Sequence, residues 1–250
     1  NETINKIKGK LLLILSKILN IYDDFFFVAG KKYLENLQLP KKKIIKGHSW
    51  DISNVWSRKT KKVSKKKYAV YLDAPGPKYL SDSFLFKEKV YETVGHTYPL
   101  LKKFFKRLEE ELGLDVIIAP HPKTKIKDRS SLFGFRRVIN GKTHDLIKNS
   151  LLVITRNSTA VSIACYYNKP IIFFFTNETL NTEAQRTTIL LSKSLGLKAI
   201  NLDNFKDYDL KKLLQFKKKK YKKYLHNFCT FKKLIIPNNK IWNDFNYERQ

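Results

Sequence analysis

The sequence contains no methionine and only two cysteines, Cys165 and Cys229, among its 250 residues. Because translation starts at methionine, we expect the chain to be a segment of a longer protein. Two cysteines far apart in the chain exclude a disulfide-stapled scaffold. The sequence also lacks an uncharged apolar run of the ~18 residues that a membrane-spanning helix needs. The best candidate, Leu11–Leu15, is flanked by lysines and predicts a largely buried helix instead.

Arginine is scarce in a chain that is otherwise strongly basic. Only eight of the 50 basic residues are arginine, and with 22 acidic residues the formal net charge is +28. Specific nucleic-acid readers rely on the planar arginine fork, and the sequence has no helix-turn-helix, zinc-finger or RNA-recognition pattern. We therefore expect no specific nucleic-acid partner. The lysine runs indicate solvated linkers and helix faces, with attraction to an anionic membrane surface as the open alternative.

Apolar residues make up 42% of the chain, which is enough for a packed core. From residue 68 onward, short and wholly apolar segments alternate with amphipathic ones. The predicted strands cover 68–73, 115–119, 151–155, 170–175 and 198–202, with helices at 98–112, 143–149, 158–167 and 180–195. Such alternation is typical of a parallel sheet covered by helices on both faces. We therefore predict an α/β, Rossmann-like domain at 68–215.

The two flanking regions do not form complete domains by this pattern. Residues 1–67 indicate the remnant of an amino-terminal α/β domain, with an apolar helix, strands near 25–30 and 44–47, and a lysine-rich linker. A further short strand is predicted at 137–140. A basic helix is predicted at 207–226. The carboxyl-terminal region, residues 216–250, contains the end of this helix and an irregular tail.

Polar side chains gather at the ends of four predicted strands, which is where ligands bind in open parallel sheets. Neither the dinucleotide fingerprint nor a phosphate-binding P-loop occurs in the sequence. The candidates are Asp73 and Gly76; His121 and Lys123; Arg156, Asn157, Ser158 and Thr159; and Thr176, Asn177 and Glu178. No residue set has metal-ligand spacing, so we expect neither a metal nor a cofactor.

The third strand end is the most informative. A helix that begins at Ser158 would offer free N–H groups and hydroxyls to an anion, with Arg156 and Thr159 beside them. The alternative is that Ser158 only caps the helix. His121 lies between two prolines, and could donate to a phosphate or act as a general acid, or be an ordinary surface histidine.

The remaining acidic candidates have weaker support. Glu178 could contact a sugar or ribose hydroxyl, or be an ordinary acid at a helix start. Asp73 could be a catalytic base or hydroxyl ligand, or a turn residue. His48 with Asp51 could add to a site from the amino-terminal part, whereas His96, His144 and His226 are interpreted as structural or surface residues.

The order of these motifs resembles the carboxyl-terminal half of GT-B-type glycosyltransferases. The segments that carry the resemblance are 116–123, 143–155, 157–162 and 169–175. They are similar to bacterial surface-polysaccharide transferases, including a sialyltransferase-like group with His-Pro and Ser-Thr motifs. The resemblance implies that His121, Ser158 and Thr159 contact the phosphate of a nucleotide-sugar donor. It also implies a catalytic base on the amino-terminal domain, for which the sequence has no clear match.

The implied activity is transfer of a sugar from the donor to a surface glycan such as capsule or lipopolysaccharide. The acceptor could be lipid-linked, and the protein would be cytoplasmic, or peripheral at the inner face of the membrane. Two alternatives stay open beside the transferase. One is a non-catalytic nucleotide-sugar-binding domain or a sugar-nucleotide epimerase, and the other is a charge-driven binder of nucleic acid or anionic surfaces.

Overall fold

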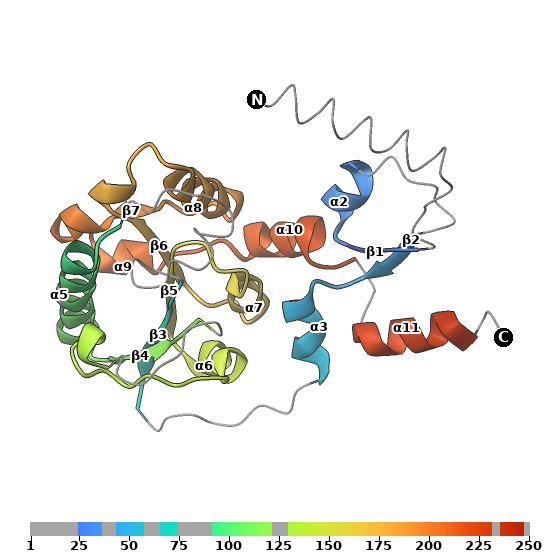
Figure 1. The fold of residues 1–250 in the computed structure, drawn as a ribbon, viewed down its shortest axis with the longest axis horizontal. Coiled ribbons are helices and arrows are strands. Elements are labelled where there is room, and N and C mark those ends of the chain that lie inside the picture. Colours follow the sequence, from blue (N-terminus) through green and yellow to red (C-terminus); the bar gives the residue numbers. More distant parts are fainter. Residues whose placement is uncertain are drawn as a thin grey trace.

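The structure, a computed structural model, describes residues 25–36, 44–57, 66–74, 92–121, 130–231 and 236–247. The apolar helix predicted near the start of the chain and most of the predicted linker lie outside these ranges. A five-stranded sheet with its helices forms one part of the molecule, and a two-stranded sheet forms the other (Figure 1). Helix α10 (Lys218–Phe228) runs between the two parts.

The larger sheet is parallel throughout and has the strand order β4-β3-β5-β6-β7. Its strands are β3 (Tyr68–Leu72), β4 (Asp115–Ala119), β5 (Leu152–Thr155), β6 (Ile171–Phe175) and β7 (Ile200–Asn201). In register, Val70 lies between Ile117 of β4 and Val153 of β5. Nearly every strand residue is buried. The predicted parallel α/β sheet is therefore confirmed, because wholly apolar strands require cover on both faces.

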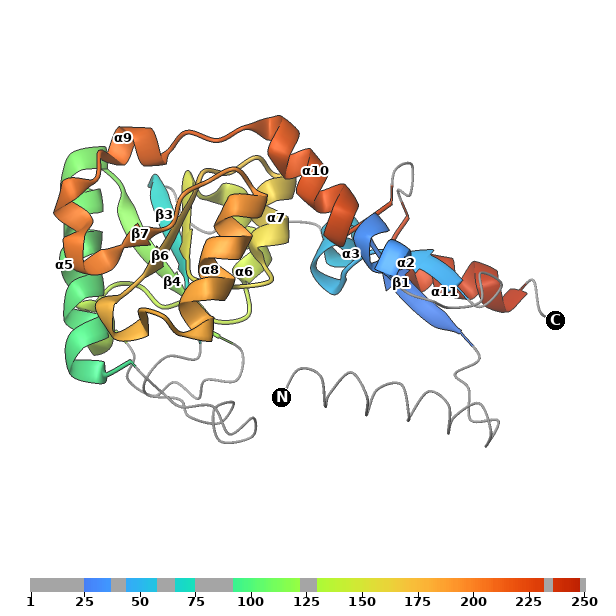
Figure 2. The ribbon, with the colours of Figure 1, turned by 90° about the horizontal axis from the view of Figure 1, so that it is seen from above.

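Helices cover the two faces of this sheet, as Figure 2 shows. Alternate strand residues supply two separate cores, with Val70 on one face and Tyr71 on the other. One face is covered by α6 (Thr143–Asn149), α7 (Val161–Tyr166), α8 (Glu183–Ser194) and α10. The other is covered by α5 (Val94–Leu112), η2 (Ser131–Phe133), η4 (Leu202–Asp207) and α9 (Leu210–Leu213).

Helix α5 shows how the sequence pattern works locally. Leu101, Phe104, Phe105 and Leu108 recur at helical spacing and are all fully buried. Gly113 ends the helix in the left-handed conformation, as predicted. The helix begins four residues earlier than the prediction, so Pro99 lies inside it. No helix in the described ranges, not even the 19-residue α5, is long and apolar enough to cross a membrane.

The smaller part is built around a parallel pair of strands and is joined by the end of the chain. Its elements are β1 (Phe26–Ala29), α2 (Lys31–Asn36), β2 (Ile44–Gly47), α3 (Trp50–Ser57) and α11 (Asn238–Tyr247). Buried His48 holds the chain end here, because its ring nitrogens bond the Thr230 hydroxyl at 2.7 Å and the Ile236 carbonyl at 2.8 Å. Helix α10 packs on α2 from one side and on α7 from the other.

Several predicted boundaries are wrong, mainly where tertiary packing overrides local propensity. The predicted helix at 207–226 is two helices, α9 and α10, separated by a bend at which Phe216 stacks on Tyr221 at 4.9 Å. The predicted irregular tail contains α11. By contrast, the helix predicted at 143–149 has these bounds in the structure, where it is α6. The predicted strand at 137–140 is a single bridge from Val138 to β4.

Candidate functional site at the switch point of the sheet

The order of the strands creates a crevice between β3 and β5. From β3 the chain crosses to β4 on one side, whereas β5 lies on the other side of β3. The connection that leaves β3 for β4 and the connection that leaves β5 for β6 therefore run in opposite directions. This arrangement opens a ligand crevice at the carboxyl ends of the strands. Asp73 follows β3 and Asn157 follows β5, so both segments flank this point.

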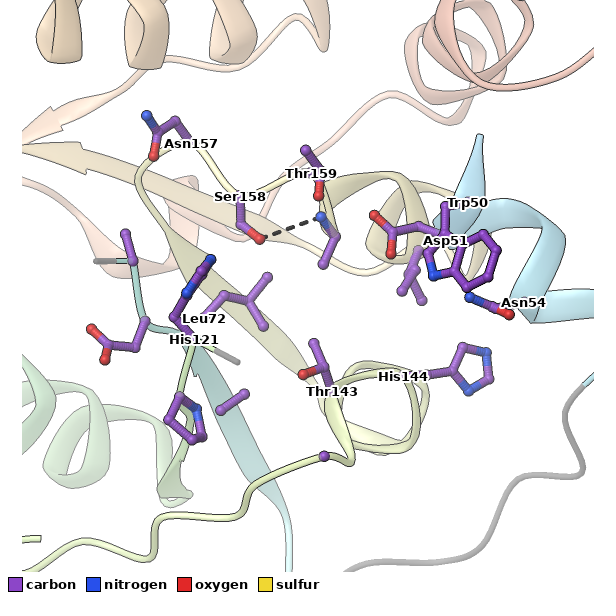
Figure 3. Close-up of a pocket in the computed structure, with 17 residues that line it drawn as sticks. Trp50, Asp51, Asn54, Leu72, His121, Thr143, His144, Asn157, Ser158 and Thr159 are labelled. Carbon is purple, nitrogen blue, oxygen red and sulfur yellow. Dashed lines mark hydrogen bonds between the residues drawn. The ribbon is translucent and has the colours of Figure 1, made fainter. Parts of the chain in front are cut away.

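A pocket of about 440 Å³ occupies this position. This volume is typical of small-molecule sites. Figure 3 shows the pocket between the strand ends and helix α3. Its lining residues are Trp50, Asp51, Asn54, Leu72, Asp73, Ala74, Ala119, Pro120, His121, Gly141, Thr143, His144, Asn157, Ser158, Thr159, Ala160 and Ile163.

Five of the predicted site residues meet in this pocket. Asp73, His121, Asn157, Ser158 and Thr159 come from the ends of three neighbouring strands and line the same cavity. Gly76 and Lys123 lie outside the described residues. These five residues lie together because parallel strands bring their carboxyl ends to one edge of the sheet.

The turn at Ser158 differs from the one we predicted. Helix α7 begins only at Val161 and has six residues, so neither Asn157 nor Ser158 caps it through a side chain. Instead, Ser158 Oγ accepts a hydrogen bond from the Ala160 N–H at 3.3 Å, within a tight turn (Figure 3). Among the described residues, the backbone N–H groups of Ser158 and Thr159 have no acceptor. The turn thus presents N–H and hydroxyl donors to the pocket.

Helix α3 supplies the opposite wall, most of which was not among the predicted site residues. Trp50, Asp51 and Asn54 line the pocket from this helix. The Thr159 hydroxyl donates to the Asp51 carboxylate. Burial raises the pKa of Asp51, and this hydrogen bond partly offsets the effect. Only the pairing of His48 with Asp51 pointed to this helix, and of these two only Asp51 reaches the cavity.

Residues at the end of β4 and the start of α6 complete the cavity. His121 is the last described residue of its segment, and Pro120 orients its backbone. The Tyr68 hydroxyl donates to the Leu146 carbonyl at 3.0 Å and so holds α6 against β3. This contact places Thr143 and His144 in the wall of the pocket. His144 is buried and bonds the Tyr167 hydroxyl at 3.2 Å, so its role is largely structural.

Arg156 does not line the pocket. Its guanidinium forms an ion pair with Glu92, and the two side chains are only 12% and 10% exposed. Burial opposes the charge of Arg156, but the neighbouring Glu92 and Asp73 carboxylates outweigh that effect and raise its pKa further. The guanidinium also lies over the Phe174 ring. We therefore leave Arg156 out of the candidate site, although it adjoins Asn157 in the sequence.

The polar residues after β6 bind other parts of the protein rather than this pocket. Glu178 accepts hydrogen bonds from the Thr93 N–H at 2.8 Å and the Thr93 hydroxyl at 2.6 Å, at the start of α5. The Asn177 N–H donates to Asp203 at 2.7 Å. Thr176 is the fully buried residue that precedes η3 (Asn177–Thr179), and it bonds Thr179 within that turn. Glu178 and Asn177 thus link η3 to the start of α5 and to η4.

No protein-family model matches the chain, and no curated protein matches it. Solved structures do. A co-structure of S. aureus MnaA with UDP is 14% identical, with a TM-score of 0.53, and the match covers 93% of this chain and 61% of that one. An H548A variant of the wall teichoic acid polymerase TagF is 13% identical, with a TM-score of 0.50, and the match covers 91% and 59%.

The chain has the GT-B fold. It spans about three fifths of the length of each of these two solved structures. Identities this low establish the architecture alone. They agree with the sequence resemblance in its coarser part, the GT-B fold, and leave the narrower sialyltransferase-like kinship without support.

Proposed function

We propose that the switch-point pocket binds the nucleotide diphosphate of a nucleotide-sugar, and that the chain acts in glycosyl transfer to a bacterial surface glycan. The observation that carries the proposal is the convergence of His121, Ser158 and Thr159 on one cavity. The crevice at the carboxyl ends of parallel strands is where this architecture places ligands. That MnaA, which has the same fold, was solved with UDP supports a nucleotide as ligand.

Each of these residues has a role that its chemistry suits. The N–H groups of Ser158 and Thr159 and the Ser158 hydroxyl would donate to phosphate oxygens, whereas the Thr159 hydroxyl already donates to Asp51. His121 would donate a further hydrogen bond, and as an acid it would stabilise the departing nucleotide. Because these donors are fixed before the reaction, they would stabilise charge that develops on the leaving phosphate. We therefore expect that the reaction does not require a metal ion. Lys123 is a further candidate for neutralising the charge of the phosphate.

The acceptor and the site of action belong to the same proposal. A growing surface glycan, either free or carried on a lipid, would be extended on the cytoplasmic side of the membrane. The lysine-rich surface of α10 supports attraction to anionic lipid head groups, because Lys218, Lys219, Lys220, Lys222 and Lys223 are all exposed.

Calorimetric titration of the full chain with CMP, UDP, GDP and their sugars tests the proposal. We expect one nucleotide to bind, and we expect His121→Ala and Ser158→Ala to lower its affinity by about 10- to 100-fold. This is the effect of losing a hydrogen bond of ~1.5–3 kcal/mol to a charged group. Ser194→Ala and His226→Ala, which change the same residue types outside the pocket, should leave the affinity unchanged.

If both pocket variants bind every nucleotide as well as the parent does, the site is wrong. Product analysis then separates the alternatives. A rearranged sugar and free nucleotide without any acceptor would indicate an epimerase, whereas an intact donor would indicate a binding domain. Unchanged turnover in EDTA would support the metal-free mechanism. Tight binding to nucleic acid with a steep dependence on salt would favour the charge-driven alternative.

A further inference from the structure

Helix α3 presents two different faces. Ile52 and Val55 point into the core and are 1% and 8% exposed, whereas Trp50 is 78% exposed although it lines the pocket. Asp51 and Asn54 lie on the same wall (Figure 3). Trp50 is thus an aromatic surface that stays in contact with solvent beside a carboxylate and an amide.

The two walls of the pocket differ in chemistry. The strand-end wall carries hydrogen-bond donors at Ser158 and Thr159, which suit an anion. The α3 wall carries the Asp51 carboxylate, which repels a phosphate because like charges disfavour each other. A phosphate in this cavity therefore lies away from α3, and the ligand part beside α3 must be uncharged or a hydrogen-bond donor.

Asp51 is held in a position from which it can bind such a ligand. Its carboxylate accepts the Thr159 hydroxyl, so Asp51 links α3 to the strand end across the pocket. An ionised carboxylate has acceptor capacity for several donors, so one hydrogen bond leaves room for others. The Asn54 amide has both donors and an acceptor on the same wall.

We propose that Trp50 and Asp51, with Asn54, form a subsite for an uncharged sugar ring. The apolar C–H face of the ring would stack on the indole, and its hydroxyls would donate to Asp51. An exposed indole next to hydrogen-bonding groups matches a ring that is apolar on its faces and polar at its rim. The inference rests on the proposed function, because the sugar would be carried by the nucleotide donor or by the glycan acceptor.

The donor source is tested by comparing a nucleotide with its sugar conjugate. Trp50→Ala should lower the affinity for the nucleotide-sugar about tenfold and leave the affinity for the free nucleotide within about twofold. Trp50→Phe should restore most of the loss, because it keeps an aromatic face. Asp51→Asn should act in the same direction as Trp50→Ala. Trp242→Ala, an exposed tryptophan on α11, is the matched control.

The acceptor source is tested with methyl glycosides as probes. In a chain with Trp56→Phe and Trp242→Phe, Trp50 is the remaining tryptophan, and a bound glycoside should protect its fluorescence from acrylamide. Protection by methyl glycosides, with no donor-specific loss in Trp50→Ala, assigns the subsite to the acceptor. Loss of sugar-conjugate affinity in Trp50→Ala assigns it to the donor.

The outcomes separate this inference from the proposed function. If no nucleotide binds the parent chain, the proposed function fails, and protection of Trp50 by glycosides still decides whether a sugar subsite exists. Equal losses for nucleotide and nucleotide-sugar, or no loss for either together with no protection by glycosides, overturn the inference. A fall in thermal stability of Trp50→Ala with no ligand-specific change also overturns it, because Trp50 would then be structural.

Discussion

The buried pair of Arg156 and Glu92 allows a test of whether Arg156, which follows β5, stabilises the fold or binds the ligand. Both side chains are nearly inaccessible, and Asp73 adds a second negative charge close by. Arg156→Ala would leave these carboxylates buried without their counter-charge. Breaking a buried pair in this way costs about 3–5 kcal/mol. For a chain of this size, that loss corresponds to a fall in Tm of about 6–20 °C.

Thermal and urea unfolding of purified variants measure this loss directly. Arg186→Ala is the matched control, because its pair with Glu183 spans 3.7 Å on the surface and is largely exposed. An exposed pair contributes at most about 1 kcal/mol, so the control should melt close to the parent. Replacing the whole buried pair, Arg156→Met with Glu92→Leu, should recover much of the loss, since neither charge is left alone.

The opposite result would refute this reasoning. If Arg156→Ala unfolds together with the parent but loses nucleotide affinity, the guanidinium binds the ligand, as the sequence alone suggested. Retained affinity in the folded fraction of a destabilised variant would support the structural role instead.

Two further predictions concern contacts outside the candidate site. Burial alone would lower the pKa of His96, but Asp203 at 2.7 Å and Glu178 at 3.2 Å raise it above 6.5. The stabilisation, below about 1 kcal/mol for a partly exposed group, is complete below the unfolded pKa and is lost as pH rises through the folded one. Tm should therefore fall more steeply from mildly acidic to mildly basic pH in the parent than in His96→Gln, and parallel profiles would contradict this. Gly30→Ala should lower Tm far more than Gly113→Ala: both residues have positive φ, but only at Gly30 would the new Cβ meet backbone of Phe228, at 2.6 Å. Equal losses would show that the conformation alone matters.

Much of the fold could be predicted because strands and helices are recorded locally in the sequence. The run from Ile171 to Phe175 is apolar at every position, and such a short run is typical of a strand buried on both faces. Leu101 to Leu108 repeats with helical spacing for the equally local reason that one face is buried. The element boundaries were less accurate because they depend on packing, as at the bend before α10.

The site divides along the same line. The sequence by itself determined that His121, Ser158 and Thr159 lie at strand ends, because the apolar runs that predict the strands stop shortly before them. Only the tertiary structure decided which neighbouring side chains face the cavity. Arg156 pairs with Glu92, which is 64 positions away, and Glu178 bonds Thr93, which is 85 positions away. Such partners come from distant segments of the chain, so the local spacing of apolar residues does not predict them. The place of helix α3 in the pocket wall could not be predicted for the same reason. It packs on α7, which lies far from it in the sequence.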